Sequence, residues 1–172
     1  MTTAPAYLRD GHLDILAANQ LGQALFSPVF DSPANPGRFL FLDPRASEFY
    51  LDWEAMARDT VAMLRSLAGH NPHDRALSNL IGELSTRSDA FRQLWAAHNV
   101  RFHRSGTKRF RHPVVGDLTL AFEALDLAAD DGLRLSIYTA EPCTPSHDAL
   151  NLLASWAATA GQDRATRAAD RA

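Results

Sequence analysis

The chain has 172 residues, of which 46% are hydrophobic and 22% are charged, a composition typical of a globular protein. This length suits one domain and is short for two, so we expect a single hydrophobic core. The formal net charge of −3 provides no long-range attraction for a phosphate backbone. DNA binding by this chain alone is therefore disfavoured.

The cysteine content and the N-terminus indicate the compartment. Cys143 is the only cysteine and cannot form an internal disulfide, and residues 1–6 lack the basic start and apolar run of a signal peptide. No apolar run reaches the length of about 18 residues that a membrane-spanning helix needs. We therefore expect a cytoplasmic protein that does not enter a membrane.

The N-terminal third begins with a predicted β-hairpin. An Asp10-Gly11 pair lies between two apolar runs within residues 7–17, and such a pair is typical of a tight turn between antiparallel strands. Asn19 can cap a short helix over 21–26. The prolines and small polar residues of 32–37 are then expected to interrupt regular structure.

The middle third is predicted to be helical. Apolar residues recur every three or four positions from 53 to 68, after Asp52 as a candidate cap. Asn71-Pro72 suits the start of a second helix, and Ser88 the start of a third. We expect three consecutive helices, each burying one face.

After residue 99 the hydrophobic period changes from helical to alternating. Residues 118–123 and 133–137 alternate between apolar and other side chains, which indicates half-buried strands joined by a turn. In the second strand the apolar positions are Leu133, Leu135 and Ile137. Ser105-Gly106 is interpreted as an earlier turn, between the segments 100–104 and 108–111.

The end of the chain completes the predicted fold. Pro145-Ser146 is expected to open a final helix, with a domain over 1–161 and a flexible tail over 162–172. Strands joined by hairpins, and not by parallel crossovers, indicate an α+β fold. We expect a five-stranded antiparallel sheet, a helical insert packed on one of its faces, and a C-terminal helix.

Several separate motifs resemble one known family. They are Arg38-Phe-Leu-Phe-Leu-Asp-Pro-Arg45, Tyr50-Leu-Asp-Trp-Glu54, Gly82-Glu-Leu-Ser85, Trp95-Ala-Ala-His98, Gly106-Thr-Lys108, His112-Pro-Val-Val-Gly116 and Tyr138-Thr-Ala-Glu-Pro142. In this order they resemble the ligand-binding domain of MmyB-like bacterial transcription regulators. The resemblance runs from about Tyr7 to about Gly161 and is more specific than any one motif.

The resemblance implies a PAS-like fold whose sheet and helices enclose a cavity for a fatty-acid-like ligand. In this family the domain usually follows an N-terminal helix-turn-helix domain. Strand-like sequence begins within a few residues of Met1, so we expect DNA binding only through a helix-turn-helix domain that this chain lacks. Cys143 follows Pro142 where the family commonly has glycine, so the turn into the last helix is expected to differ.

A cavity for an apolar ligand needs aromatic and aliphatic walls with a few orienting polar groups. The third helix and the facing strands offer candidates for these walls, which are Phe91, Trp95, Leu120, Phe122 and Tyr138. Without the resemblance, the same side chains would be interpreted as ordinary core packing.

Two positions are candidates for binding a ligand head group. His98 lies one helical turn after Trp95, so its imidazole could bind a carboxylate, although a histidine also suits the negative end of a helix. Arg101 begins a basic stretch over 101–112 in which phenylalanines are interleaved. A hairpin with its charges in water explains this stretch better than nucleic-acid binding, and an anionic head group near Arg101 or Lys108 remains open.

The sequence shows no constellation for catalysis. Ser146 and His147 are neighbours at a helix start, where side chains diverge, and Ser146 suits an N-cap. There is no Gly-x-Ser-x-Gly, His-Glu-x-x-His or Cys-x-x-Cys motif. We therefore expect neither an enzyme nor a bound metal or cofactor.

The favoured hypothesis is a sensor domain of a transcription regulator that binds an apolar small molecule. A PAS-like dimerisation module without a ligand is the first alternative, and a small cavity-based enzyme is the second. We also expect a homodimer, because regulators commonly read symmetric half-sites.

Overall fold

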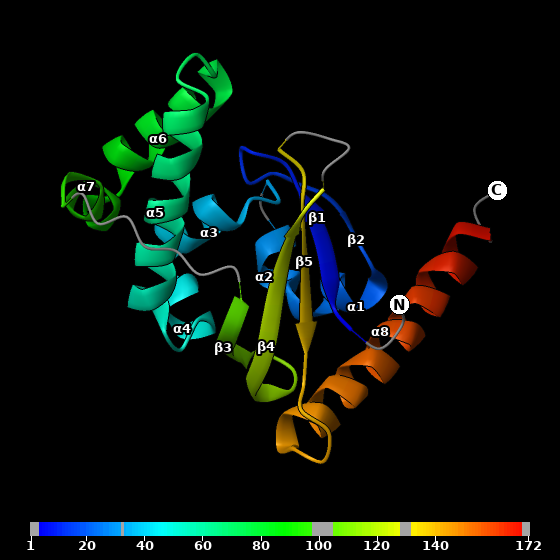
Figure 1. Cartoon of the computed structure of the whole chain (residues 1–172). Coiled ribbons are helices and arrows are strands. Elements are labelled where there is room, and N and C mark those ends of the chain that lie inside the picture. Colours follow the sequence, from blue (N-terminus) through cyan, green and yellow to red (C-terminus); the bar gives the residue numbers. More distant parts are fainter. Residues whose placement is uncertain (1–3, 32, 98–104, 128–131, 170–172) are drawn as a thin grey trace.

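The computed structural model describes residues 4–31, 33–97, 105–127 and 132–169, the last part of it (160–169) by its backbone alone. Within this part of the chain, five strands form one antiparallel sheet in the order β2-β1-β5-β4-β3 (Figure 1). The strands are β1 (Ala6–Arg9), β2 (Ile15–Ala18), β3 (Ser105–His112), β4 (Gly116–Asp126) and β5 (Arg134–Thr139). The first two form the expected hairpin, and β5 lies between β1 and β4.

The helices α1 to α7 connect β2 to β3, and α8 follows β5. They are α1 (Gln20–Leu25), α2 (Ser27–Phe30), α3 (Pro36–Leu42), α4 (Ala46–Phe49), α5 (Trp53–His70), α6 (Arg75–Arg87), α7 (Asp89–Ala96) and α8 (Pro145–Ala169). In Figure 1, α5 stands beside β3 with α6 and α7, while α8 begins below the sheet and runs outward. The broad order of two strands, a helical insert, three strands and a final helix is the one that the sequence predicts, although α3 and α4 have no counterpart among the predicted helices. The flexible tail over 162–172 stays a prediction.

Helix ends follow local side-chain chemistry. Asn19 and Ser88 cap α1 and α7 through their side-chain oxygens, as the sequence predicts. The cap of α6 is Asp74 and not Asn71. Asn71 instead ends α5, because its backbone N–H donates to the carbonyl of Leu67 at 2.9 Å.

One helix begins where the sequence predicts irregular structure. Within the proline-containing stretch 32–37, Pro36 occupies the first position of α3 and Asn35 is its cap. Proline is well suited to this position because its missing N–H would have no partner inside the helix anyway. The stretch therefore starts a helix and does not only separate elements.

One face of the sheet is covered by helices and holds the core. β4 presents Leu118, Leu120 and Phe122 to this face, as its alternation predicts. Phe26 after α1 and Phe49 in α4 pack there against rings of the sheet. The ring centroids lie 5.0 to 6.3 Å apart among Phe26, Phe49, Phe110 and Tyr138. The helical insert thus packs on one face, and the α+β, PAS-like expectation is confirmed.

The set of alternate residues of β5 that faces the core differs from the prediction; we call this choice the phase of the strand. Ser136 and Tyr138 are buried on the core face, opposite Ala124 and Phe122 of β4, whereas Leu135 is only half-buried on the other face. Register with β4 decides this phase, because paired residues in neighbouring strands share one face. The alternation of β5 by itself is compatible with either phase.

β3 also differs from the prediction. Ser105 and Gly106 are not a turn but the first residues of the strand, paired with Glu123 and Phe122 of β4. Gly106 adopts a φ of +150°, which glycine reaches without strain. The segment 100–104 lies outside the described residues.

Candidate ligand-binding cavity

A cavity of about 80 Å³ lies between the core face of the sheet and helices α3 and α5; we call it the inner cavity. Its floor comes from four strands and consists of Tyr7, Arg9, Lys108, Phe122, Ala124, Arg134, Ser136 and Tyr138. These side chains share one face because the register pairs Tyr7 with Ser136 and Phe122 with Tyr138. Residues far apart in the sequence are thereby brought to one surface.

The roof of the inner cavity is one face of α5 together with the start of α3. The lining positions of α5 are Met56, Asp59, Thr60 and Met63. Their spacing of three and four residues places them on one side of the helix. From α3 come Pro36, Gly37 and Leu40.

The turn between β1 and β2 closes one end. Its Leu13 lines the cavity and has a φ of +67°, a conformation uncommon for a branched residue. The carboxylate of Asp10 holds the turn by accepting from the backbone N–H groups of His12 and Asp14 at 2.8 and 2.9 Å. A Cβ on Gly37 would lie only 2.8 Å from Leu13 Cδ1, so glycine permits the close contact of α3 with this turn.

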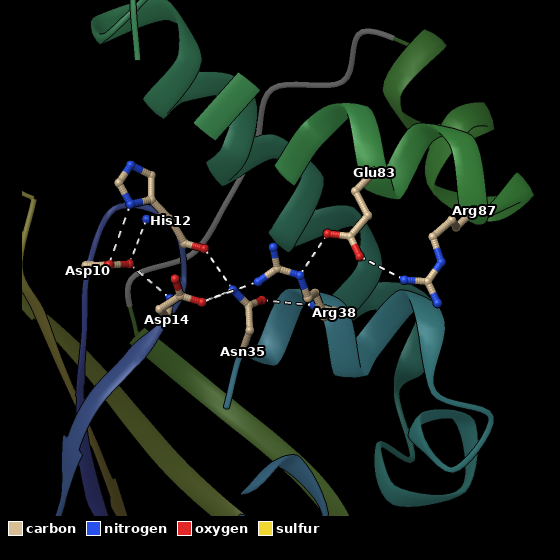
Figure 2. Close-up of polar contacts among 7 residues, drawn as sticks. All are labelled: Asp10, His12, Asp14, Asn35, Arg38, Glu83 and Arg87. Carbon is tan, nitrogen blue, oxygen red and sulfur yellow. Dashed lines mark hydrogen bonds and ion pairs between the residues drawn. The ribbon is translucent and has the colours of Figure 1, made fainter. Parts of the chain in front are cut away.

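A chain of polar contacts fixes α3, and with it the roof, against its neighbours (Figure 2). Asn35 is fully buried, accepts from the backbone N–H of Arg38 at 3.0 Å and donates to Asp14 at 2.8 Å. Arg38 donates to Glu83 of α6 at 2.8 Å, and Glu83 also accepts from Arg87. The hairpin turn, α3 and α6 are thereby held as one unit.

Two guanidinium groups meet at one sulfur atom in the inner cavity. Arg9 is only 6% exposed and donates to Met63 Sδ at 2.8 Å and to the carbonyl of Asp10 at 3.1 Å. Arg134 reaches the same sulfur at 3.6 Å and pairs with Asp126 at 2.6 Å. Both arginines come from strand positions that face the core.

Lys108 is the only lysine in the sequence, and its side chain borders the same cavity. Its Nζ lies 4.1 Å from the ring centroid of Phe122, within range of a cation–π contact. Burial lowers the pKa of Lys108 to about 8, with Asp59 opposing this shift and Arg9 adding to it. A substantial neutral fraction of this amine is thus expected near pH 8.

A second, larger cavity of about 280 Å³ adjoins the first between α5 and β3; we call it the outer cavity. The residues that line both are Met56, Asp59, Lys108 and Phe122. Arg9, Met63 and Arg134 line only the inner cavity. Lys108 and Phe122 therefore stand where the two cavities meet, whereas the two guanidinium groups belong to the inner cavity alone.

Residues 1–153 match the family described as MmyB-like transcription regulator ligand binding domain. The chain belongs to this family. Among curated proteins, none matches the chain.

The structure places the expected site residues of this MmyB-like domain in different surroundings. Phe122 and Tyr138 line the inner cavity. Leu120 is buried in the core beside it, and Phe91 stacks on Trp95 in α7 at 5.6 Å, away from the residues that line either cavity. His98 and Arg101 lie outside the described residues. Ligand contacts by any of the seven stay a prediction.

Sequence reasoning missed the two arginines and Ser136 in the cavity of this MmyB-like domain. Arg9 ends a short strand and Arg134 begins one, positions where a charged side chain is usually exposed. Their pairing across β1 and β5 places both on the core face. A charged residue at a core-facing position of a strand is the pattern that could have identified them. To apply it to Arg134, one must first know which residues of β5 face the core.

The features considered for catalysis have structural roles. Ser146 Oγ accepts from the backbone N–H of Thr119 at 2.8 Å and so joins α8 to β4. The cap of α8 is Thr144, whose hydroxyl accepts from the backbone N–H of His147 at 3.2 Å.

In the described ranges, no three His, Cys, Asp or Glu side chains gather in a metal-binding arrangement. No helix in those ranges has the length and apolar character to span a membrane.

Proposed function

We propose that this domain senses an apolar small molecule of the fatty-acid type, which binds between the sheet and helices α3 and α5. The observation that carries the proposal is a cavity between the core face and the helical insert, in a chain that belongs to a family of ligand-binding domains. We further propose that the domain works in the cytoplasm, reaches DNA only through a helix-turn-helix domain, and is not an enzyme.

The size of the site supports an extended ligand. Small-molecule sites commonly have volumes of about 300 to 1,000 Å³. The inner cavity alone is smaller than this, but with the adjoining outer cavity the space reaches the lower end of the range. Leu40, Met56 and Phe122 supply apolar contacts along this space. An acyl chain would follow it from one cavity into the other.

Ligand binding must favour one arrangement of the regulator to act as a signal. A ligand shifts an equilibrium between two states only by its difference in affinity for them. The roof is the element best placed to respond, because α3 and α5 contact the cavity while the sheet provides the rigid floor. A change in the roof would then reach the α6 contact through Arg38 and Glu83.

Thermal melting of delipidated protein with saturated fatty acids, each below its micelle concentration, tests this proposal. Each buried methylene is worth about 0.8 kcal/mol, so affinity should rise with chain length until the space is filled. At a free concentration of 100 times the Kd, the stabilisation is about 2.7 kcal/mol, or a rise in Tm of roughly 5 to 10 °C. Native mass spectrometry of the purified protein would identify a bound molecule directly.

Ala124→Leu provides a variant that fills the cavity without removing core contacts, because Ala124 is a small residue in the floor. Ala121→Leu on the exposed face of the same strand is the matched control. We expect the first variant to lose the ligand-induced shift and the second to keep it. Unchanged melting of the unsubstituted protein for every chain length, with no co-purified molecule, would instead favour the dimerisation module.

A further inference from the structure

The inner cavity carries more positive than negative charge. Arg9, Lys108 and Arg134 line it from three strands, whereas Asp59 is the one carboxylate among its described lining residues. Arg134 is already paired with Asp126. In the described part of the chain, neither Arg9 nor Lys108 forms an ion pair.

Arg9 has weak partners for a buried guanidinium. A buried charge is normally paired, because it has lost its hydration. The partners of Arg9 are the carbonyl of Asp10 and the thioether of Met63, and sulfur is a weak acceptor. Arg134 approaches the same sulfur, so two like charges face each other across it.

Packing alone does not explain this arrangement. An unpaired buried cation destabilises a fold, and hydrophobic residues of similar size would fill the same space at lower cost. Met63 has a flexible side chain that can take up another rotamer. An anion in the place of the Met63 sulfur would accept hydrogen bonds from the guanidinium groups of both Arg9 and Arg134.

We propose that Arg9 and Arg134 bind the oxyanion head group of the ligand inside the inner cavity, with Lys108 where the two cavities meet. This inference rests on the proposed function and adds to it the residues that bind the head group and the direction of the apolar chain. The head group takes the place of the Met63 sulfur between the guanidiniums. The forked donors of arginine suit a carboxylate or a phosphate.

The two cavities give the ligand a direction. Arg9 and Arg134 line only the inner cavity of about 80 Å³, whereas the outer cavity between α5 and β3, at about 280 Å³, has more room for an apolar chain. The head group therefore lies inward and the chain extends past Phe122 toward the outer cavity. Lys108, at the junction, is the third cation that lines the inner cavity and adds to its attraction for an anion.

Calorimetric titration of the delipidated protein with three twelve-carbon compounds tests the proposal. These are dodecanoate, dodecyl phosphate and the uncharged 1-dodecanol, each below its micelle concentration. A charge-assisted hydrogen bond is worth enough to give a difference of about tenfold in Kd. We expect the better of the two anions to bind at least about tenfold more tightly than the alcohol, and their ratio identifies the preferred oxyanion.

Variants test which residues carry this selectivity. Arg9→Met and Lys108→Met should each reduce the preference for the anion over the alcohol by about tenfold, with little change in the Kd of the alcohol. Arg111→Met is the control, since it removes one positive charge from the exposed side of β3. It should leave the preference unchanged. If Arg9→Met does not fold, Lys108→Met and Arg111→Met still form a complete comparison.

The outcomes separate the two proposals. Equal affinity for dodecanol and both anions, or an equal loss of preference in Arg111→Met, would overturn the head-group inference and leave the apolar ligand in place. Absence of binding by all three compounds would overturn both proposals.

Discussion

Replacement of Lys108 by methionine is predicted to stabilise the ligand-free domain. The pKa of Lys108 falls from 10.5 to about 8 on folding because burial disfavours its charged form. Each pKa unit corresponds to about 1.4 kcal/mol, so near neutral pH the charged amine lowers the free energy of unfolding by about 3 kcal/mol. Methionine keeps a long apolar side chain against Phe122 without this charge. We expect a gain of about 1 to 3 kcal/mol at pH 7.

The pH dependence follows from the direction of that shift. Between pH 8 and 10.5 the unfolded chain holds a proton on this amine that the folded chain has released, so stability from this group rises with pH across that window. Lys108→Met lacks the group, and its advantage should therefore shrink from pH 7 toward pH 10.

Urea unfolding at pH 7, 8.5 and 10 measures this difference. Because the sequence has one lysine, the side-chain signal of protein labelled with ¹³C-lysine also reports the pKa directly. A less stable variant at pH 7, or a lysine pKa near 10.5 in the ligand-free protein, would refute the reasoning. Dodecanoate should raise this pKa if the head group binds as proposed.

Three other predictions concern stability and assembly. Asn35→Ala should lower the free energy of unfolding by about 2 to 4 kcal/mol in urea unfolding, because it leaves the buried partners of Asn35 unsatisfied and removes the cap of α3. As the control, Asn151→Ala on the exposed side of α8 should change this free energy by less than about 0.5 kcal/mol. Burial opposes the charge on His12, yet hydrogen bonds and charge from Asp74 and Asp10 raise its pKa. The contribution of charged His12 to the stability of the fold should be complete below about pH 6.5 and be lost as the pH rises through the pKa of the folded state. Melting curves from pH 5 to 8 should show this loss in the unsubstituted protein, and His12→Ala should lack it. Light scattering at micromolar concentrations should give the mass of a homodimer, and a monomeric mass at all concentrations would exclude it.

Local sequence chemistry was sufficient to predict the broad order of two strands, a helical insert, three strands and a final helix, but it did not predict α3 or α4. The Asp10-Gly11 pair, the cap at Asn19, the cap at Ser88 and the alternation in β4 each depend on residues close together in the chain. The phase of β5 was not predictable in this way, because Ser136 is turned inward by pairing with Ala124 of β4.

The candidate site was less predictable than the fold for the same reason. A cavity is space between elements that meet only in the folded chain, and no local pattern reports it. Phe122 and Tyr138 were identified through the family resemblance, and both line the inner cavity. Arg9 resembles an ordinary surface residue until its partner strand is known. The burial of Arg9 on the core face could therefore be recognised only once the pairing of β1 with β5 was known.

The position of β5 between β1 and β4 has a consequence for biosynthesis. β1 pairs Ala6 with Ile137, so this strand can pair with its central neighbour only after the chain through Ile137 has left the ribosome. Contacts between such distant residues make folding slow, because a long loop must close before they form. Arg134 belongs to this late strand as well. A nascent chain can therefore form its helices early, but the sheet that carries the inner cavity is complete only after β5 has been synthesised.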